Sequence, residues 1–252
     1  MLAAKLQLQF DPIALKADLA SLRVSEWAPH FNTRYFEGDW SHAALRAPAD
    51  ASAPQADAAQ HVFVDTPLLA ACPNLRAALD RFTCPLRGVR LLRLAAGSSI
   101  REHQDYDLGE DLGELRIHVP ITTHPAVEFF VEGRRFTLAE GECWYLDLAR
   151  PHWVNNRSPI DRVHLVLDCK LDDWLAAELA LATPCAGEVG EFEHFRARVL
   201  ADPAIAESLV GLEREVFIAR TVELGQALGF GFLASDVDAA LNAARRAWTA
   251  IP

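Results

Sequence analysis

Between Gly88 and Cys169, short runs of residues that favour β-strands alternate with turn residues. This pattern restricts the fold more than any other feature of the sequence. The runs are GVRLLRLAAGSSI, ELRIHVPITT, VEFFVEGRRFTL, GECWYLDLA, HWVNN and DRVHLVLDC. Within them, VEGRRF predicts a tight hairpin that turns at Glu132 and Gly133. Several short strands without a long helix between them favour an antiparallel sandwich or barrel.

Helical patterns flank this β-rich region. The opening KLQLQF predicts a strand, and the Asp-Pro that follows predicts the N-cap and first residue of a helix. After Cys169 the apolar spacing is wholly helical, apart from a break, TPCAGEVGE, at 183–191. We therefore expect a mainly β domain at 1–182 and a small helical domain or helical cap at 190–252.

Charge and cysteine usage exclude several classes of protein. A formal net charge of −11 argues against nucleic acid or an anionic membrane surface as the partner. No run of about 18 apolar residues predicts a membrane span, and the N-terminus does not resemble a secretory signal. Five cysteines without a CxxC pair predict reduced thiols in a cytoplasmic protein.

The motif HQD places His103 and Asp105 two residues apart at the end of a predicted strand. Alternate residues of a strand point the same way, so both side chains can reach one metal ion. Two histidines and one carboxylate on one face of an octahedron are the ligands of mononuclear non-haem iron. An exposed acidic turn is the alternative interpretation. Later histidines that could complete the site are His118, His124, His152 and His164.

The position of Arg162 favours one of these four histidines as the remaining metal ligand. His152 follows a strand and a proline in LARPHWVNN, and Arg162 opens the apolar strand DRVHLVLDC ten residues later. A guanidinium in an apolar strand needs a carboxylate, because a buried unpaired charge costs several kcal/mol. A dicarboxylic cosubstrate would supply one, bound by both ends of the arginine fork. His164 shares a strand face with Arg162 and remains an alternative ligand.

From about Trp40 to Cys169 the sequence resembles the aspartyl/asparaginyl β-hydroxylase family of Fe(II)- and 2-oxoglutarate-dependent dioxygenases. The resemblance is carried by HQD, LRIHVPI, FFVEGRRFTLAEGECWYLD, HWVNN and DRVHLVLDC, with DWSHAALR upstream. It implies a double-stranded β-helix, a distorted jelly roll, which agrees with the strand pattern. Animal members carry glycine where Asp105 stands, so the carboxylate suggests the bacterial branch that contains the proline cis-4-hydroxylases.

The resemblance also implies roles for single residues. The implied iron ligands and catalytic centre are His103, Asp105 and His152. Arg162 would anchor the distal carboxylate of 2-oxoglutarate, while Arg116 and His118, which alternation places on one strand face, would line the cosubstrate and substrate pocket. With O2 as the second cosubstrate, such a site hydroxylates an unactivated C–H bond.

The expected substrate is an amino acid or an amino-acid residue in a peptide. Its carboxylate would need a cation, and we expect contacts from Trp40, Arg46 and Arg116, with the small, polar segment 47–60 as a loop or flap.

The C-terminal region at about 190–245 resembles the Nif-eleven-type leader-peptide domains. The matching segments are ADPAIAESL, ARTVELGQALGFGF and SDVDAAL, although the usual double-glycine cleavage site is missing. A peptide partner of the helical tail and a homo-oligomer both remain open. The alternative function is a non-catalytic cupin-like binding module whose helical tail recruits a partner.

Overall fold

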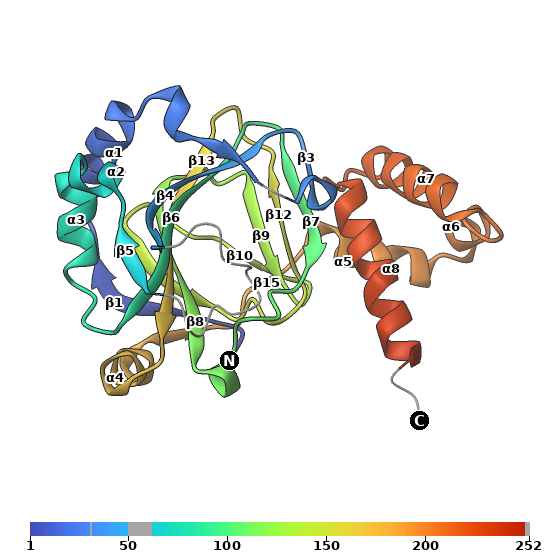
Figure 1. The fold of residues 1–252 in the computed structure, drawn as a ribbon. Helices are drawn as coiled ribbons and strands as arrows, with labels where there is room; N and C mark the ends of the chain where they lie inside the picture. The colour runs from blue at the N-terminus through green and yellow to red at the C-terminus, as the bar shows by residue number, and fades with distance from the viewer. Residues whose placement is uncertain (31, 50–61, 250–252) are drawn as a thin grey trace.

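Residues 1–30, 32–49 and 62–249 are described by the structure, a computed structural model (Figure 1). The predicted loop at 47–60 falls largely on 50–61, outside the described residues. None of the described helices is long and apolar enough to cross a lipid bilayer.

Two antiparallel sheets form the β region. The larger sheet runs in the order β14 (Thr183–Cys185), β1 (Ala3–Gln9), β11 (Glu142–Leu146), β8 (Glu114–Thr122), β13 (Arg162–Lys170), β6 (Leu86–Leu94), β4 (Trp40–Pro48) and β2 (Ala28–Pro29), with β5 (Phe63–Asp65) also paired to β4. The smaller sheet runs β15 (Glu188–Val189), β10 (Arg134–Phe136), β9 (Val127–Val131), β12 (His152–Asn156), β7 (Ser99–His103) and β3 (Phe36–Glu37).

The chain crosses repeatedly between the sheets. From β6 to β13, successive strands lie in the large, small, large, small, small, large, small and large sheet. This eight-strand crossing pattern is that of a jelly roll, so the predicted double-stranded β-helix is confirmed. The predicted hairpin between β9 and β10 is also confirmed, since Glu132 (φ 47°) and Gly133 (φ 75°) both take the left-handed conformation of a two-residue turn.

Four helices cover the outer face of the large sheet: α1 (Pro12–Ser21), α2 (Pro67–Ala70), α3 (Pro73–Leu79) and α4 (Asp173–Leu181). The register of β13 shows how the sheet separates two environments. Val163, Leu165 and Leu167 pack in the apolar core under these helices, whereas Arg162 and His164 point between the sheets. The polar side chains of the site are therefore held by strands that are anchored from behind by a dry core.

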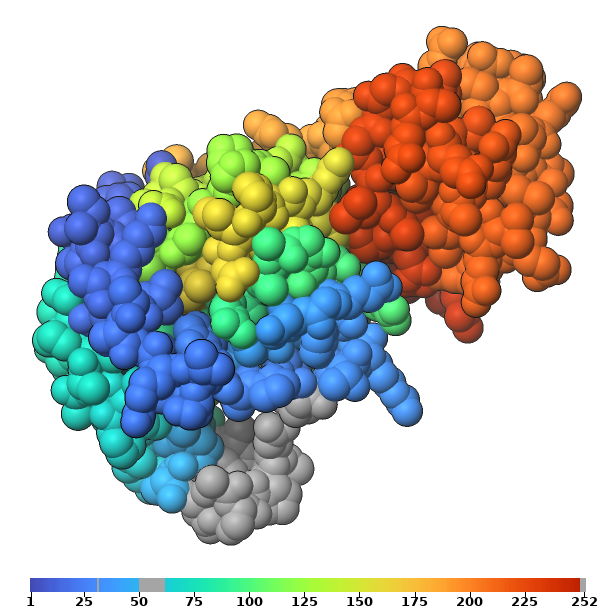
Figure 2. Space-filling view, turned by 90° about the horizontal axis from the view of Figure 1, so that it is seen from above, coloured from blue at the N-terminus to red at the C-terminus, as the bar shows by residue number. Residues whose placement is uncertain are grey.

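The C-terminal helices are α5 (Glu191–Ala201), α6 (Pro203–Glu207), α7 (Arg214–Ala227) and α8 (Ala234–Thr249). They form a lobe beside the small sheet, on the side opposite α1–α3 (Figures 1 and 2). Phe195, Phe232 and Val237 are the buried centre of this lobe.

The segment predicted as a domain boundary is built into both sheets. Its β14 pairs with β1 at the end of the large sheet, and its β15 pairs with β10 at the end of the small sheet. The two-domain division at 1–182 and 190–252 stays a prediction.

Candidate metal centre

A β-bulge turns His103 toward the space between the sheets. His152 of β12 lies opposite His103, but Val154 lies opposite Ile100, so β7 has one extra residue between these two pairs. Without that residue, strict alternation from the inward-facing Ile100 would send Glu102 inward and His103 outward. The bulge thus places both histidines on the inner face of neighbouring strands.

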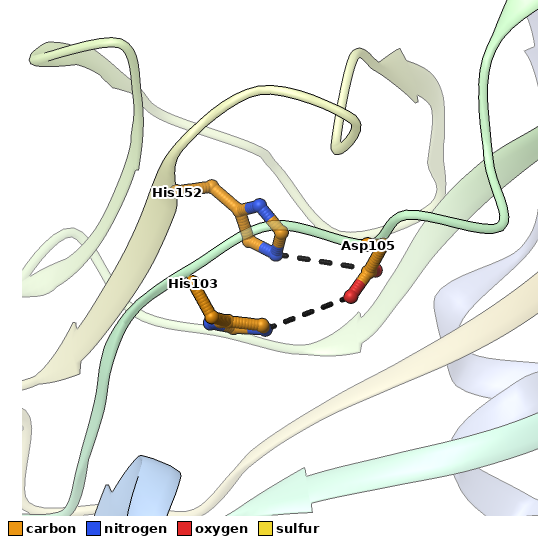
Figure 3. A group of neighbouring side chains, drawn as sticks. All are labelled: His103, Asp105 and His152. Atoms are coloured by element: carbon orange, nitrogen blue, oxygen red, sulfur yellow. Dashed lines mark ion pairs between the residues drawn. The ribbon is translucent and has the colours of Figure 1, made fainter. Parts of the chain in front are cut away.

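His103, Asp105 and His152 converge on one point (Figure 3). The Nε2 atom of His103 lies 3.8 Å from Oδ1 of Asp105, and Nε2 of His152 lies 4.0 Å from Oδ2 of the same carboxylate. One ligand atom from each residue lies within 4.8 Å of the other two. Two imidazole nitrogens and one carboxylate oxygen at this spacing suit a divalent transition metal.

Hydrogen bonds from the backbone fix both imidazole rings. Nδ1 of His103 donates to the carbonyl of Arg101 at 2.9 Å, and Nδ1 of His152 donates to that of Arg150 at the same distance. Each ring thereby carries its proton on Nδ1 and turns an unprotonated Nε2 toward the cluster. Burial, aided by the neighbouring His103, lowers the pKa of His152 to about 4, so this ligand is neutral at pH 7.

Arg116 holds the carboxylate of Asp105 in place. Its Nη1 donates to Oδ2 of Asp105, and its Nε donates to Oδ1 of Asp168 at 2.6 Å. Asp168 in turn accepts a 2.6 Å bond from Nη1 of Arg90. Burial alone would raise the pKa of Asp105, but the charge of Arg116, together with smaller contributions from His152, His103 and Arg90, outweighs burial and keeps that pKa below its ordinary value. The ligand therefore sits at the end of an alternating chain of charges.

A second polar group lies deeper between the sheets. Arg162 is 1% exposed, its Nη2 donates to Nδ1 of His164 at 2.7 Å, and its guanidinium lies 5.7 Å from the centre of the Phe129 ring. Nδ1 of His118 is 3.3 Å from Nδ1 of His164. Among the described residues, Arg162 has no carboxylate within ion-pair distance, and its Nε has no hydrogen-bond partner. Burial lowers the pKa of Arg162 to about 9.

Aromatic side chains close the site on the His103 side. The Tyr35 ring stacks on His103 with centroids 5.3 Å apart, and Trp40 lies 6.3 Å from His103. Trp40 is itself stacked on His30 at 3.5 Å. Trp40, which was predicted to contact the substrate, therefore borders the metal-ligand cluster. Tyr35 and His30, which were not predicted as site residues, lie beside it.

Arg46 does not join this group. It lies on β4 six residues beyond Trp40, which corresponds to about 20 Å along a strand. Its Nη1 pairs with Asp65 at 2.5 Å, and its other nitrogens donate to the carbonyls of Phe63 and Leu86. These bonds tie β4 to its neighbours. The predicted substrate contact of Arg46 has no support in this geometry.

Sequence reasoning also missed two members of the site. Asp168 and Arg90 complete the chain of charges behind Asp105. Asp168 lies an even number of residues after Arg162 in β13, so strand alternation places both on the inner face of the sheet. What the sequence could not reveal is that Arg116, expected to contact cosubstrate and substrate, is bonded to two carboxylates of the chain itself. That expected contact stays a prediction.

Comparison with known proteins points to one family. The model of the family described as aspartyl/asparaginyl β-hydroxylase matches residues 14–171, which include every member of the cluster. The L-proline cis-4-hydroxylase of Rhizobium meliloti (strain 1021) is 27% identical over 165 residues, which cover 64% of this chain and 58% of that protein. The chain thus spans less than two thirds of this relative's length. The family model ends at residue 171 and does not include the helical lobe. The resemblance of that lobe to leader-peptide domains therefore stays a prediction.

Solved structures give partial likenesses. A 2OG-Fe(II) oxygenase-family oxidoreductase from Burkholderia pseudomallei has a TM-score of 0.44 at 19% identity, covering 63% of this chain and 77% of its own. A Pseudomonas putida prolyl-4-hydroxylase has a TM-score of 0.42 at 14% identity, covering 68% of this chain and 93% of its own. Both TM-scores are below 0.5, too partial a likeness to carry a conclusion about chemistry.

Proposed function

The chain belongs to the aspartyl/asparaginyl β-hydroxylase family, and from this premise we propose that it is an Fe(II)- and 2-oxoglutarate-dependent dioxygenase. Its substrate would be an amino acid or an amino-acid residue in a peptide, hydroxylated at an unactivated C–H bond. The observation that carries the proposal is the convergence of His103, Asp105 and His152, with both Nε2 atoms facing the carboxylate. This donor set fits Fe(II).

The chain's own residues would position the reactants. The backbone carbonyls behind His103 and His152 would keep both rings oriented while the metal is absent or exchanging. Arg116 would hold one oxygen of Asp105 and so restrict how that carboxylate can bind. When bound, Fe(II) and 2-oxoglutarate supply the oxidising chemistry, in which O2 is consumed and 2-oxoglutarate leaves as succinate and carbon dioxide.

Arg162 is the proposed anchor for the distal carboxylate of 2-oxoglutarate. A buried guanidinium without a carboxylate partner among the described residues is costly unless a ligand provides one. His118, beside His164 in the same group, is proposed to line this pocket. Trp40 and Tyr35 would exclude water on the His103 side.

The test is aerobic incubation with Fe(II), 2-oxoglutarate and candidate amino acids, with succinate as the product measured. Free L-proline is the first candidate, because the curated relative is an L-proline cis-4-hydroxylase. Absence of succinate with every substrate, together with absence of Fe(II) binding, would leave a non-catalytic cupin-like binding module as the better description.

The choice of histidine ligand needs its own pair of variants. His152→Ala should abolish stoichiometric Fe(II) binding, because it removes one of the three convergent groups. His164→Ala is the matched control, because His164 is equally buried but lies in the Arg162 group. Loss of Fe(II) binding in His164→Ala alone would assign the second nitrogen ligand to His164 instead.

A further inference from the structure

A cleft of about 560 Å³ separates the outer face of the small sheet from the C-terminal helices. Phe130 of β9 and Trp153 of β12 line it from the sheet side, and Ala240 and Ala243 of α8 line it from the helical side. Figure 1 shows the two parts that border it, the small sheet and the helical lobe. The volume is typical of a ligand site.

Negative charge dominates the lining of the cleft. Its six carboxylates belong to Glu102, Glu128, Glu132, Glu191, Glu193 and Asp236. Arg246 pairs with Glu102, Arg196 pairs with Glu193, and Arg150, from outside the lining, pairs with Glu132. The third lining arginine, Arg134, donates to two backbone carbonyls. The excess negative charge of the lining therefore comes from the other three carboxylates, those of Glu128, Glu191 and Asp236. The lining therefore favours a cationic ligand.

Of the two buried carboxylates in the lining, Glu128 and Asp236, Glu128 has the weaker compensation. It is 7% exposed, and within the described part of the chain its oxygens accept hydrogen bonds from Nδ2 of Asn155 at 3.4 Å and Nη1 of Arg157 at 3.5 Å, both at the limit of a hydrogen bond. Burial raises its pKa, and the nearby charge of Asp236 raises it further. Asp236, in contrast, accepts from Trp153 at 2.8 Å and from the backbone of Leu233 at 2.7 Å.

The aromatic pair beside Glu128 suits the apolar part of such a ligand. The Phe130 and Trp153 rings are stacked, with centroids 4.6 Å apart and planes 10° apart. The methylene groups of a lysine or arginine pack well on aromatic surfaces while the cation binds a carboxylate. Val189 of β15, the end strand of the small sheet, also lines the cleft, and an end strand can bind an extended backbone.

We infer that this cleft binds a peptide segment bearing a lysine or arginine side chain, with the cation at Glu128 and the methylenes against Phe130 and Trp153. The site is separate from the metal cluster, since these residues face outward on strands whose alternate residues face inward. Binding here requires neither Fe(II) nor 2-oxoglutarate. The inference therefore stands or falls independently of the proposed function.

In the experiment, the full chain is titrated into a fluorescently labelled peptide of alternating lysine and glycine, and the anisotropy of the label is measured. A metal chelator is present throughout, so that no Fe(II) is bound. Ala243→Arg adds a like charge at an exposed, cleft-lining position of α8, and should raise the peptide Kd about tenfold or more. Ala244→Arg is the matched control: it adds the same charge to the next residue, which does not line the cleft. Its Kd should stay within about twofold of the wild type.

Glu128→Gln provides a second test that keeps side-chain size and removes the charge. It should also weaken binding about tenfold, because the cation loses its buried partner. The inference is overturned if the wild type shows no saturable binding, or if a peptide of alternating glutamate and glycine binds as tightly. Equal Kd values for Ala243→Arg and Ala244→Arg would overturn it too. Displacement of the peptide by equimolar spermidine would overturn the assignment to a peptide.

Discussion

Replacing Arg162 by methionine should make the protein more stable and make the proposed enzyme lose its cosubstrate. The Arg162 guanidinium is buried, and among the described residues the acceptor of its hydrogen bond is Nδ1 of His164. Burial lowers the pKa of Arg162 to about 9. This displacement from the ordinary pKa of arginine corresponds to roughly 5 kcal/mol by which burial disfavours the charged form. Methionine removes that cost and fills a similar volume.

The net gain is smaller than this figure because favourable contacts are lost as well. Arg162 gives up its hydrogen bond to His164 and its position over the Phe129 ring, each worth about 1 kcal/mol. His118, whose Nδ1 lies 3.3 Å from Nδ1 of His164, can donate in place of the lost bond. We expect the free energy of unfolding in denaturant to rise by about 1–3 kcal/mol.

Binding of 2-oxoglutarate should change in the opposite direction. Loss of a buried partner to a carboxylate costs about 2–5 kcal/mol, which corresponds to roughly a 30-fold to several-thousand-fold increase in Kd. Anaerobic titration calorimetry of the Fe(II)-loaded chain measures this change.

Arg116→Met is the matched comparison. It also removes a buried guanidinium, but it leaves Asp105 and Asp168 without the cation that both contact, so the free energy of unfolding should fall by about 3 kcal/mol. If Arg162→Met destabilised the chain as much as Arg116→Met, Arg162 would have a partner within the protein. Unchanged affinity for 2-oxoglutarate in Arg162→Met would refute its assignment as the anchor.

Three other perturbations probe the supports of the site and of the helical lobe. Asp168→Asn should weaken Fe(II) binding about 10- to 100-fold in calorimetry, because Arg116 loses the carboxylate that fixes it; unchanged affinity would mean that Asp105 needs no support. The pKa of His30 is lowered to about 4, chiefly by burial, so below pH 6.5 the unfolded state binds a proton that the folded state does not, and stability falls between pH 6.5 and 4. His30→Phe should reduce the slope of the free energy of unfolding against pH by the share of one histidine, while His152 keeps its own share; an unchanged slope would contradict the role of His30. Gly225→Ala should destabilise the chain by about 1–3 kcal/mol in denaturant melts, since the new Cβ would lie 2.3 Å from the Phe232 ring; a neutral effect would show that the ring can move.

The sequence was most informative where a single strand decides the outcome. Alternation alone placed Arg116 and His118 on one face of β8, and both do point between the sheets. The hairpin at Glu132 and Gly133 was likewise readable, because two adjacent residues with positive φ leave a local signature.

Features that depend on two strands could not be predicted. The bulge that aims His103 is a mismatch in residue count between β7 and β12, and neither strand shows it alone. The bonds of Arg116 to Asp105 and Asp168 depend on how β8 lies beside β13 and the end of β7. Local patterns gave the residue types of the site, whereas their partners are set by register.

The short strands β14 and β15 also bear on solubility. They pair with β1 and β10, which would otherwise be end strands of the two sheets, and both belong to one continuous stretch of chain. A chain cut at 182 would leave both edges free for pairing with other molecules, and would uncover Phe130 and Trp153 beside one of them. Uncovered edges next to apolar side chains promote aggregation, so the β region is expected to remain dispersed only while the residues that follow it are attached.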